Sequence, residues 1–470
     1  MPRTKIVCTV GPACASVEML RTLIRAGMNV ARINFSHGDH AAHALRIANV
    51  RHAAQAEGAL VALLGDLQGP KLRIGEIEGG YTLTRPGDEV VLTTRAVPGN
   101  AGEIHLPHPD LVREVVPGQR LLLDDGQLEF VVLDTTESDI RCRVVSGGPL
   151  SSHKGVAAPG APLSLSPLTD KDRADLAFAI QQAVDFLALS FVRTGSDVCL
   201  LRDTLEAQGA HIPIVAKIEK AEALDAFDEI LACSDAIMIA RGDLGVEIPA
   251  ERVPFVQKDF IARCNRAGIP VITATQMLNS MITNPRPTRA EASDVANAIL
   301  DGTSAVMLSA ETATGEYPIQ SVQMMARIAA ITEEHIHYEH ALQHLWEDKA
   351  QSATTAISQA TVEIADELEA KAIVTSTYSG YTARWVASYR PRTPVIAVTP
   401  RPEVQRQLAL AWGVIPMLAP AYTTTDEMIQ SATQLAQASG LAGRGDTIVI
   451  TAGIPAGADH KTNMLKVHVI

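Results

Sequence analysis

Short apolar runs alternate with amphipathic helical patterns from the start of the chain. Residues 5–10 (KIVCTV), 30–36 (VARINFS) and 59–67 (ALVALLGDL) are nearly continuous apolar runs, whereas 17–27 and 40–57 have the apolar spacing of helices. Continuous apolar runs are typical of parallel strands that are buried on both faces. The pattern therefore predicts parallel strands that are connected by helices.

This alternation stops between residues 70 and 165. The stretch is rich in Gly and Pro, and its short apolar segments EVVLTT, QRLLLDD and LEFVVLD are typical of β-strands. We predict an inserted lid domain over residues 70–166, folded as a small β-barrel.

The alternation returns at Thr169, which is placed to cap the next helix. Five more apolar runs follow, each separated by a helical pattern: DFLALSFV, IPIVAKIE, DAIMIARGD, IPVITAT and SAVMLSAE. Three strands before the insert and five after it make eight. We therefore predict a closed (β/α)₈ barrel, a TIM barrel, over residues 1–69 and 167–340.

The last part of the chain has its own α/β pattern. Residues 335–350 are polar and His-rich and are expected to form a connector. After a helix that starts at residue 353, the strand-like runs are AIVTST, PVIAVT, DTIVIT and LKVHVI, with a further helix at 425–438. This predicts a separate open-sheet α/β domain over residues 350–470.

Composition excludes several classes of function. The chain has 470 residues, of which 47% are hydrophobic, so it can form several cores. Its formal net charge of −13 argues against a nucleic-acid or acidic-membrane partner. The N-terminus lacks the apolar stretch of a signal peptide, and no apolar run reaches the roughly 18 residues of a membrane span. We expect a cytoplasmic protein.

The cysteines form no CxxC pair, so neither a zinc site nor a thioredoxin-like motif is indicated. Cys8, Cys199 and Cys264 lie in apolar runs and are expected to be buried, reduced thiols. The other cysteines are Cys14, Cys142 and Cys233.

Polar residues follow the predicted barrel strands. In (β/α)₈ enzymes the carboxyl ends of the strands converge on one mouth, where the chemistry takes place. A single polar strand end could simply face solvent or cap a helix, but seven in succession favour a site. These residues are Asn34, Ser36, His37, Asp66, Ser190, Arg193, Lys217, Glu219, Arg241, Asp243, Thr273, Thr275, Gln276, Ser309 and Glu311.

Lys217 and Glu219 are two positions apart on one predicted strand, so both face the barrel axis. Glu219 and Asp243 would supply hard oxygen ligands from neighbouring strands, which suits Mg²⁺. Lys217 would then give positive charge to a transferring phosphoryl group, or deliver a proton. The alternative is a structural ion pair inside the barrel.

Six segments carry a family resemblance: TKIVCTVGPA (4–13), NVARINFSHG (29–38), GDLQGPKLR (65–73), VAKIEKAEAL (215–224), IMIARGDLGVEIP (237–249) and the long segment from ATQMLN to GEYP (274–318). In this order they closely resemble the pyruvate kinases over nearly the whole chain. The resemblance implies a barrel, a lid, a C-terminal regulatory domain and a homotetramer. It also implies transfer of the phosphoryl group of phosphoenolpyruvate to ADP, giving pyruvate and ATP in glycolysis.

The resemblance implies roles for matching residues. Glu219 and Asp243 match the Mg²⁺ ligands, and Mn²⁺ could replace Mg²⁺. The catalytic positions are matched by Lys217, Thr275 and Arg32, and the substrate-binding ones by Arg32, Lys217, Ala240, Arg241, Gly242, Asp243 and Thr275. The nucleotide-side positions are matched by Thr9, Pro12, Asn34, His37, Arg73 and Lys154, with Asp125 beside them on the lid.

One departure from the family concerns K⁺. Asn34, Ser36, Asp66 and Leu67 match the usual K⁺ site, but Lys71 stands where members that need K⁺ usually carry a glutamate. A lysine ammonium would supply the same positive charge permanently, so we predict that activity does not require K⁺. The alternative is a solvated lysine at the hinge of the lid.

A second departure concerns regulation. The segment 375–382 follows a predicted strand and opens a helix, where hydroxyls and free N–H groups suit a phosphate. The effector candidates are Ser376, Thr377, Ser379, Gly380 and Thr382. Tyr378 replaces the lysine that is frequent in members using fructose bisphosphate, and the late loop 453–461 lacks their Trp/Arg pair. We expect a sugar monophosphate or a nucleotide as effector; the alternative is a capped helix without a ligand.

Other classes of function remain as alternatives. Another Mg²⁺ barrel enzyme acting on pyruvate or its enolate would have no reason to keep Arg32, Asn34, Arg73 and Lys154. A non-catalytic protein on this scaffold would be expected to have lost the Mg²⁺ carboxylates or Lys217. A P-loop kinase is set aside because no GxxxxGK[ST] segment occurs.

Overall fold

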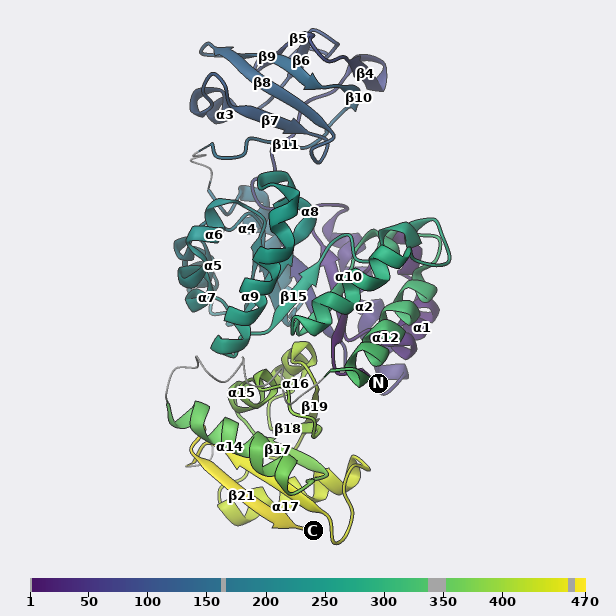
Figure 1. Cartoon of the computed structure of the whole chain (residues 1–470), viewed down its shortest axis with the longest axis vertical. Coiled ribbons are helices and arrows are strands. Elements are labelled where there is room, and N and C mark those ends of the chain that lie inside the picture. The colour runs from purple at the N-terminus through teal and green to yellow at the C-terminus, as the bar shows by residue number, and fades with distance from the viewer. Residues whose placement is uncertain (1, 162–165, 337–351, 455–460) are drawn as a thin grey trace.

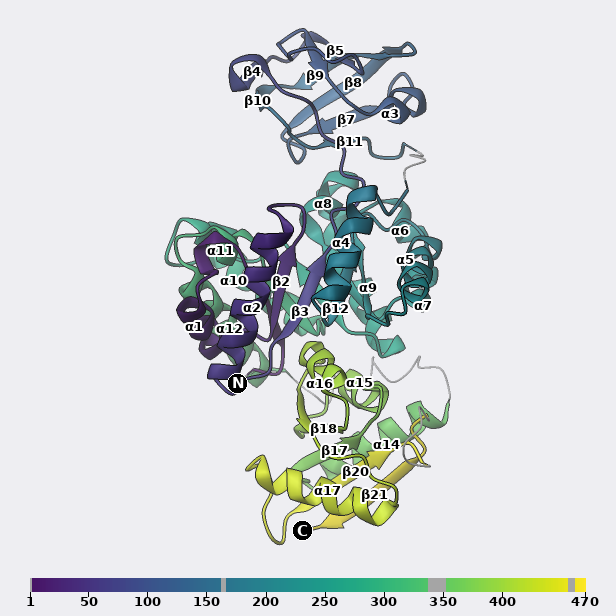
Figure 2. The same ribbon diagram turned by 180° about the vertical axis from the view of Figure 1, so that it is seen from behind.

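The computed structural model describes residues 2–161, 166–336, 352–454 and 461–470. Figure 1 shows a β domain at one end of the long axis, a barrel in the middle, and an α/β domain with the C-terminus at the other end. The view from behind in Figure 2 has the same order. Most of the predicted connector, and residues 455–460 of the late loop, lie outside the described residues.

The middle region is a closed barrel of parallel strands, which confirms the predicted (β/α)₈ fold. Its strands, in chain order, are β1 (Lys5–Thr9), β2 (Val30–Asn34), β3 (Ala62–Asp66), β12 (Phe186–Leu189), β13 (Ile214–Ile218), β14 (Ala236–Ala240), β15 (Val271–Ala274) and β16 (Ala305–Leu308). Every residue of β3, β13 and β14 is buried, as the continuous apolar runs predict.

Helices surround this barrel and pack their apolar faces on the strands. They are α1 (Val17–Ala26), α2 (His40–Ala56), α4 (Asp170–Gln181), α5 (Gly195–Ala207), α6 (Glu222–Asp225), α7 (Phe227–Cys233), α8 (Arg241–Glu247), α9 (Val253–Ala267), α10 (Arg289–Leu300), α11 (Ala310–Ala313) and α12 (Pro318–Glu334). Thr169 caps α4 as predicted, and its side chain forms a capping box with Asp172.

The insert after β3 is a β domain with its own apolar core. Its strands are β4 (Tyr81–Thr84), β5 (Glu89–Thr93), β6 (Glu103–His105), β7 (Arg120–Leu123), β8 (Leu128–Thr135), β9 (Asp139–Ser146), β10 (Gly148–Ser151) and β11 (Val156–Ala157), with helix α3 (Pro109–Glu114). These strands form a six-stranded sheet and the pair β10–β4, rather than one closed sheet.

The C-terminal region is an open five-stranded sheet of order β19-β18-β17-β20-β21. Its elements are α14 (Ala353–Glu367), β17 (Ala372–Ser376), α15 (Tyr381–Ser388), β18 (Val395–Thr399), α16 (Pro402–Gln407), β19 (Val414–Leu418), α17 (Thr425–Ala438), β20 (Thr447–Ala452) and β21 (Met464–Val469). Strand β19 was not predicted. It is a partly exposed edge strand that contains Pro416, which weakens its sequence signal.

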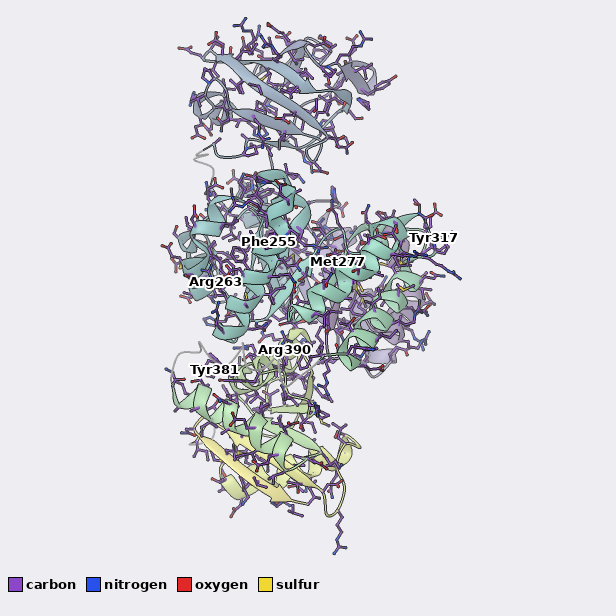
Figure 3. All side chains as sticks on the ribbon, viewed as in Figure 1. Phe255, Arg263, Met277, Tyr317, Tyr381 and Arg390 are labelled. Atoms are coloured by element: carbon purple, nitrogen blue, oxygen red, sulfur yellow. The ribbon has the colours of Figure 1, made fainter. Side chains whose placement is uncertain are left out.

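The C-terminal region packs on the end of the barrel opposite the insert (Figures 1 and 2). Arg406 Nε lies 2.6 Å from Asp185 Oδ1, just before β12. Arg390, which Figure 3 labels at this boundary, donates to Asn265 Oδ1 at 2.9 Å and lies over the Trp412 ring. These polar contacts tie the two regions together.

All six cysteines are free. Cys8 and Cys264 are buried as expected, but the expectation for Cys199 is wrong because this residue is exposed. On α5 the buried side chains are Val198, Leu201 and Leu205, so Cys199 points away from that face. No helix in the described part of the chain combines the length and apolar character that a membrane crossing requires.

Candidate active site

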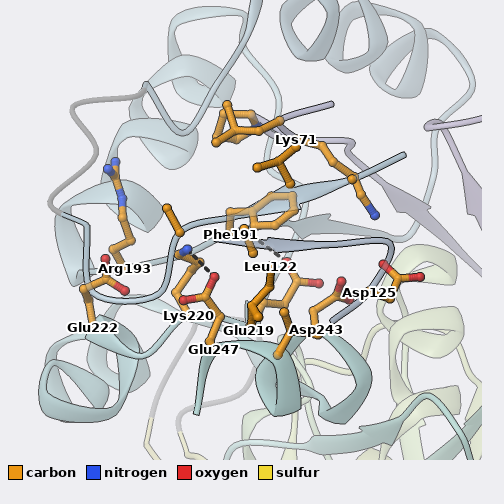
Figure 4. A pocket seen from close by; sticks show the side chains of 17 residues that line it. Lys71, Leu122, Asp125, Phe191, Arg193, Glu219, Lys220, Glu222, Asp243 and Glu247 are labelled. Atoms are coloured by element: carbon orange, nitrogen blue, oxygen red, sulfur yellow. Dashed lines mark hydrogen bonds and ion pairs between the residues drawn. The ribbon is translucent and has the colours of Figure 1, made fainter. Parts of the chain in front are cut away.

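A cavity lies where the insert covers the carboxyl ends of the barrel strands (Figure 4). Both parts of the chain contribute to its walls. The insert and its hinge supply Pro70, Lys71, Leu72, Leu122, Asp125, Gly155, Val156, Ala157 and Ala158, and the barrel supplies Phe191, Arg193, Glu219, Lys220, Glu222, Asp243, Val246 and Glu247.

Lys217 is the buried cation at the base of the site. Its Nζ lies 2.9 Å from Glu219 Oε1 and 3.3 Å from Asp66 Oδ1. It also donates a 2.7 Å hydrogen bond to Ser190 Oγ. Burial lowers the pKa of Lys217, but the two carboxylates outweigh this and raise it above its usual value. The ammonium therefore stays charged at neutral pH, which favours an electrostatic role over proton delivery.

Glu219 and Asp243 come from the ends of the paired strands β13 and β14 and line the same cavity. Glu219 Oε2 accepts a 2.8 Å hydrogen bond from the Phe191 N–H. Burial and the Asp243 carboxylate raise the pKa of Glu219, although Lys217 opposes them. The Asp243 carboxylate has no hydrogen-bond or ion-pair partner among the described residues. A divalent cation between these carboxylates would remove their repulsion and give Asp243 a partner.

The donor set fits Mg²⁺ better than a closed metal site. No group of three or more His, Cys, Asp or Glu side chains arranged for a metal occurs in the described part of the chain. Mg²⁺ is commonly held by one or two carboxylates, with water and substrate oxygens as its other ligands. Glu219 and Asp243 meet that requirement.

Arg32 lies next to Lys217 through their common partner Asp66. Arg32 Nε is 2.6 Å from Asp66 Oδ2, and its Nη1 donates to Thr9 Oγ1 at 2.9 Å. Burial opposes ionisation of Asp66, but Lys217 and Arg32 hold its pKa below the usual range. The Thr9 hydroxyl, predicted on the nucleotide side, thus orients Arg32.

Positive charge surrounds His37 at the mouth. Burial lowers the pKa of His37, and the cations Arg73, Lys71, Arg32 and Lys171 lower it further. A field of this sign attracts phosphate groups. The nucleotide-side predictions His37 and Arg73 therefore fall in one electropositive region with Arg32, which was predicted to bind the substrate.

Lys154 and Arg73 both contact groups of the insert. Lys154 Nζ on the insert pairs with Asp124 Oδ1 at 2.7 Å. Arg73 Nη1 donates to the carbonyl of His153 at 2.8 Å, so both cations are tied to the insert. Pro12 opens the short 3₁₀ helix Pro12–Cys14 after β1.

Thr275 and Gly242 meet at the ends of adjacent strands. Thr275 Oγ1 accepts from the Gly242 N–H at 2.7 Å and donates to the Ala274 carbonyl at 2.6 Å. Thr275 and Gln276 both have left-handed φ values, 66° and 54°. A non-Gly residue with such a φ is uncommon, and strained backbone of this kind clusters at functional sites.

Arg241 differs from its neighbours in the predicted substrate loop. Its two Nη atoms lie 2.7 Å from the two carboxylate oxygens of Asp294, and Nη2 also donates to the Thr275 carbonyl at 3.0 Å. The guanidinium therefore holds the Thr275 turn in place. Of the loop Ala240–Asp243, only the backbone and Asp243 remain for a substrate.

The residues that match a K⁺ site have protein partners. Asn34 Oδ1 accepts from the Ser36 N–H at 3.0 Å, and the Leu67 carbonyl accepts from Ser190 Oγ at 2.7 Å. Both oxygens of Asp66 already face cations. Lys71 lines the cavity, and its ammonium group points toward the side that holds Asp125 (Figure 4).

The effector candidates lie at the end of β17 and the start of α15. Ser376 Oγ donates to the Tyr422 hydroxyl at 2.6 Å, and the hydroxyls of Thr382 and Thr462 are 2.8 Å apart. Gly380 has a φ of 79° and precedes α15. The Thr377 N–H bonds the Val398 carbonyl, whereas no hydrogen bond of the Ser379 hydroxyl is found in the described part of the chain.

Some cavity residues were not predicted. Lys220 Nζ and Glu247 Oε1 form a half-buried ion pair at 2.5 Å, and both residues lie inside motifs that resemble the family. Phe191, with a φ of 57°, contributes its N–H to Glu219. A backbone donor carries no side-chain signal, so sequence reasoning had no means to find it.

Comparison with known proteins places the chain in a family. The family model described as "Pyruvate kinase, barrel domain" matches residues 1–322, and "Pyruvate kinase, alpha/beta domain" matches residues 355–468. The chain belongs to the pyruvate kinase family. It is therefore an enzyme of the phosphotransferase class, as the motifs imply.

Individual pyruvate kinases agree with this assignment. The pyruvate kinase of Geobacillus stearothermophilus is 51% identical over 471 residues, covering all of this chain and 80% of the relative. The "Pyruvate kinase 2" of Synechocystis is 48% identical over 473 residues, covering all of this chain and 79% of the relative. A crystal structure of a pyruvate kinase from Cryptosporidium parvum has a TM-score of 0.94 and 40% identity, covering 100% of this chain and 96% of the other.

Proposed function

We propose that the protein transfers the phosphoryl group of phosphoenolpyruvate to ADP, giving pyruvate and ATP, in the cavity between insert and barrel. One observation carries this proposal: Glu219 and Asp243 line that cavity, Lys217 Nζ lies 2.9 Å from Glu219 Oε1, and the Asp243 carboxylate has no protein partner among the described residues. Phosphoryl transfer depends mainly on positioning and on charge stabilisation, which this arrangement supplies.

In this mechanism Glu219 and Asp243 hold Mg²⁺. When bound, the ion supplies Lewis-acid stabilisation of phosphoryl oxygens. The Lys217 ammonium stabilises the negative charge of the phosphoryl group during transfer. Arg32, fixed by Asp66 and Thr9, binds a phosphate oxygen and lies close enough to act with Lys217.

The other predicted residues orient the two substrates. The backbone of Ala240–Asp243 binds the carboxylate of phosphoenolpyruvate. The Thr275 hydroxyl lies on the path of the proton to the methylene carbon of the enolate, which becomes the methyl group of pyruvate. Arg73, His37 and Lys154 lie on the nucleotide side. Closure of the insert over the mouth would exclude water and so limit hydrolysis.

The charge at the mouth supports K⁺ independence. Lys71 adds a permanent cation beside Arg32 and Arg73, all of which act on His37. A monovalent cation is then redundant, because the site already carries its charge.

The hydroxyls at the start of α15 support a phosphate effector of the sugar-monophosphate or nucleotide kind. Ser379 remains available, and Ser376 and Thr382 could exchange their hydroxyl partners for a phosphate. Activation titrations with ribose 5-phosphate, AMP and fructose 1,6-bisphosphate test this. Strong activation by the bisphosphate alone would contradict it.

We also propose a homotetramer. The 74% exposed Phe255 on α9 leaves an apolar group on the barrel surface that suits a subunit contact. Sedimentation velocity measures the assembly, and a monomer at micromolar concentration would refute it.

A coupled lactate dehydrogenase assay tests the main proposal. Pyruvate should form from phosphoenolpyruvate only when both ADP and a divalent cation are present. Pyruvate formation without ADP would favour a lyase or a related enzyme on the same barrel, and no turnover under any condition would favour a binding protein.

A further inference from the structure

Cys199 and Cys233 lie next to each other on the outside of the barrel. Cys199 is exposed on α5, and Cys233 is the partly exposed last residue of α7. Their Sγ atoms are 3.0 Å apart. Figures 1 and 2 both show α5 and α7 side by side on the barrel flank, whereas the other four cysteines are buried.

A second set of contacts fixes this approach. Arg202, one turn after Cys199 on α5, donates from Nη2 to the carbonyl of Cys233 at 2.7 Å and lies 2.9 Å from Asp235 Oδ2. The same Asp235 oxygen accepts from the Ile214 N–H at the start of β13. The end of α7 is thus held against α5 by groups other than the thiols, so the two sulfur atoms are positioned by the fold.

We propose that Cys199 and Cys233 are a redox-active dithiol, which a peroxide converts to an intrachain disulfide. The exposed Cys199 thiol reacts first: hydrogen peroxide transfers one oxygen to Sγ, leaving a sulfenic acid and one water. Cys233 Sγ then attacks Cys199 Sγ, the S–O bond breaks, and a second water leaves with the Cys233 proton. The two thiols lose two electrons and the peroxide gains them.

Formation of the disulfide requires little movement of the two sulfur atoms. A disulfide has an S–S distance of about 2.05 Å, so the sulfur atoms must approach by roughly 1 Å. The hydrogen bond between the thiols, then burial, raise the pKa of Cys233 to about 11; Glu229 acts in the same direction and Arg202 against it. Cys233 is therefore protonated at neutral pH, and this is the proton that leaves with the second water when the disulfide forms.

The bond would close a loop that contains β13. Residues 199 and 233 enclose Lys217 and Glu219, so the disulfide would tie together the two helices that flank the catalytic strand. Closing such a loop reduces the entropy of the unfolded chain. We expect the midpoint of thermal unfolding to rise by about 3 °C on oxidation.

Peptide mapping tests the proposal on the full-length, reduced protein. After treatment with stoichiometric hydrogen peroxide and blocking of free thiols, digestion without reductant should yield a peptide pair joined through Cys199 and Cys233, which dithiothreitol separates. The pair should be absent from Cys199→Ser and Cys233→Ser and present in the control Cys142→Ala. Sulfinic acid at Cys199 with Cys233 still free, or dimers linked through Cys199, would overturn the proposal.

A bridging reagent gives an independent measurement without oxidation. Phenylarsine oxide joins two neighbouring thiols, so the reduced wild-type protein should bind one equivalent, and each single serine variant should lose it. Pyruvate formation by reduced Cys199→Ser should equal that of the wild type, since neither cysteine lies in the active-site cavity. Failure of the wild type to bind the arsenical while its thiols are reduced would contradict the pairing.

Discussion

The two ends of the barrel both bury carboxylates, but they differ in how completely those carboxylates are paired. At the end that packs on the C-terminal region, Asp185 has both oxygens occupied: Oδ1 by Arg406 at 2.6 Å and Oδ2 by the Leu63 N–H at 2.8 Å. At the end covered by the insert, Glu219 shares Lys217 with Asp66, and Asp243 has no partner among the described residues.

This difference separates a structural ion pair from a binding site. Asp185 pairs with Arg406 away from the active-site cavity, and this partner mainly offsets the cost of its burial. A carboxylate that faces a cavity unpaired can hold a cation. Burial alone would have ranked Asp185 and Asp66 as equals, since both are almost fully buried.

The largest effect is expected from replacing Lys217, the cation at the end of the barrel that the insert covers. Replacement Lys217→Met should lower kcat about 10³-fold, because the transferring phosphoryl group loses its nearest fixed positive charge. Pyruvate formation measures it, with circular dichroism as the control for folding. A rate close to wild type would show that Lys217 is only a structural partner of Asp66 and Glu219.

The second largest effect is expected for Asp243→Asn, which should weaken the binding of the divalent cation. We expect the Mg²⁺ concentration for half-maximal rate to rise about 100-fold, since one of two charged ligands is lost. The matched control is Asp185→Asn, whose carboxylate pairs with Arg406 at the other end of the barrel. The assignment is wrong if the Mg²⁺ titration of Asp243→Asn overlays that of the wild type.

Exchange of Lys71 tests the monovalent-cation proposal. The wild type should keep its rate in buffer free of Na⁺ and K⁺, whereas Lys71→Glu should be slow there and recover many-fold on addition of KCl. The reason is that the glutamate removes a permanent cation and adds an anion beside Arg32 and Arg73. A many-fold KCl activation of the wild type itself would sink this proposal.

At the end of the barrel that packs on the C-terminal region, Arg406→Ala should lower stability and leave turnover unchanged. Removal of the partner leaves Asp185 buried with a single hydrogen bond, so we expect a loss of about 2 kcal/mol in the free energy of unfolding. The partial exposure of Arg406 keeps this below the full cost of an unpaired buried charge. Urea unfolding gives the free energy, and a parallel kcat measurement would expose any unexpected role in catalysis.

The smallest expected effect concerns pH. Lys217 and Arg32 overcome burial and lower the pKa of Asp66, whereas burial outweighs Leu63 and Arg406 and raises the pKa of Asp185. Asp66 therefore adds stability above its unfolded pKa of about 4, and this is lost as the pH falls through its folded value. The contribution of Asp185 to stability is present below its unfolded pKa of about 4. This contribution is lost as the pH rises through the higher pKa that Asp185 has in the folded protein.

Thermal unfolding of two variants between pH 3 and 7 measures the contrast. The difference in Tm between wild type and Asp66→Asn should shrink as the pH falls, and that between wild type and Asp185→Asn should grow. Parallel trends for both variants would mean that the two carboxylates do not differ as described.

Much of this fold follows from local pattern. The apolar runs predicted all eight barrel strands, because a strand buried on both faces has few polar positions, and the Thr169 cap was visible in the chain. Strand β19 was missed because an edge strand with Pro416 and half-exposed residues lacks that pattern. Cys199 was misplaced because an apolar run does not say which face of its helix looks outward.

The sequence alone determined which chemical groups stand at the strand ends, since the period of a strand and the direction of a parallel barrel bring those ends to one mouth. Only the tertiary structure decided which of them are already paired. In the folded protein Arg241 pairs with Asp294, and the Thr9 hydroxyl orients Arg32. The Asp243 carboxylate faces the cavity. Pairing depends on distances of a few ångströms between residues far apart in the chain, and no local pattern of residues encodes such distances.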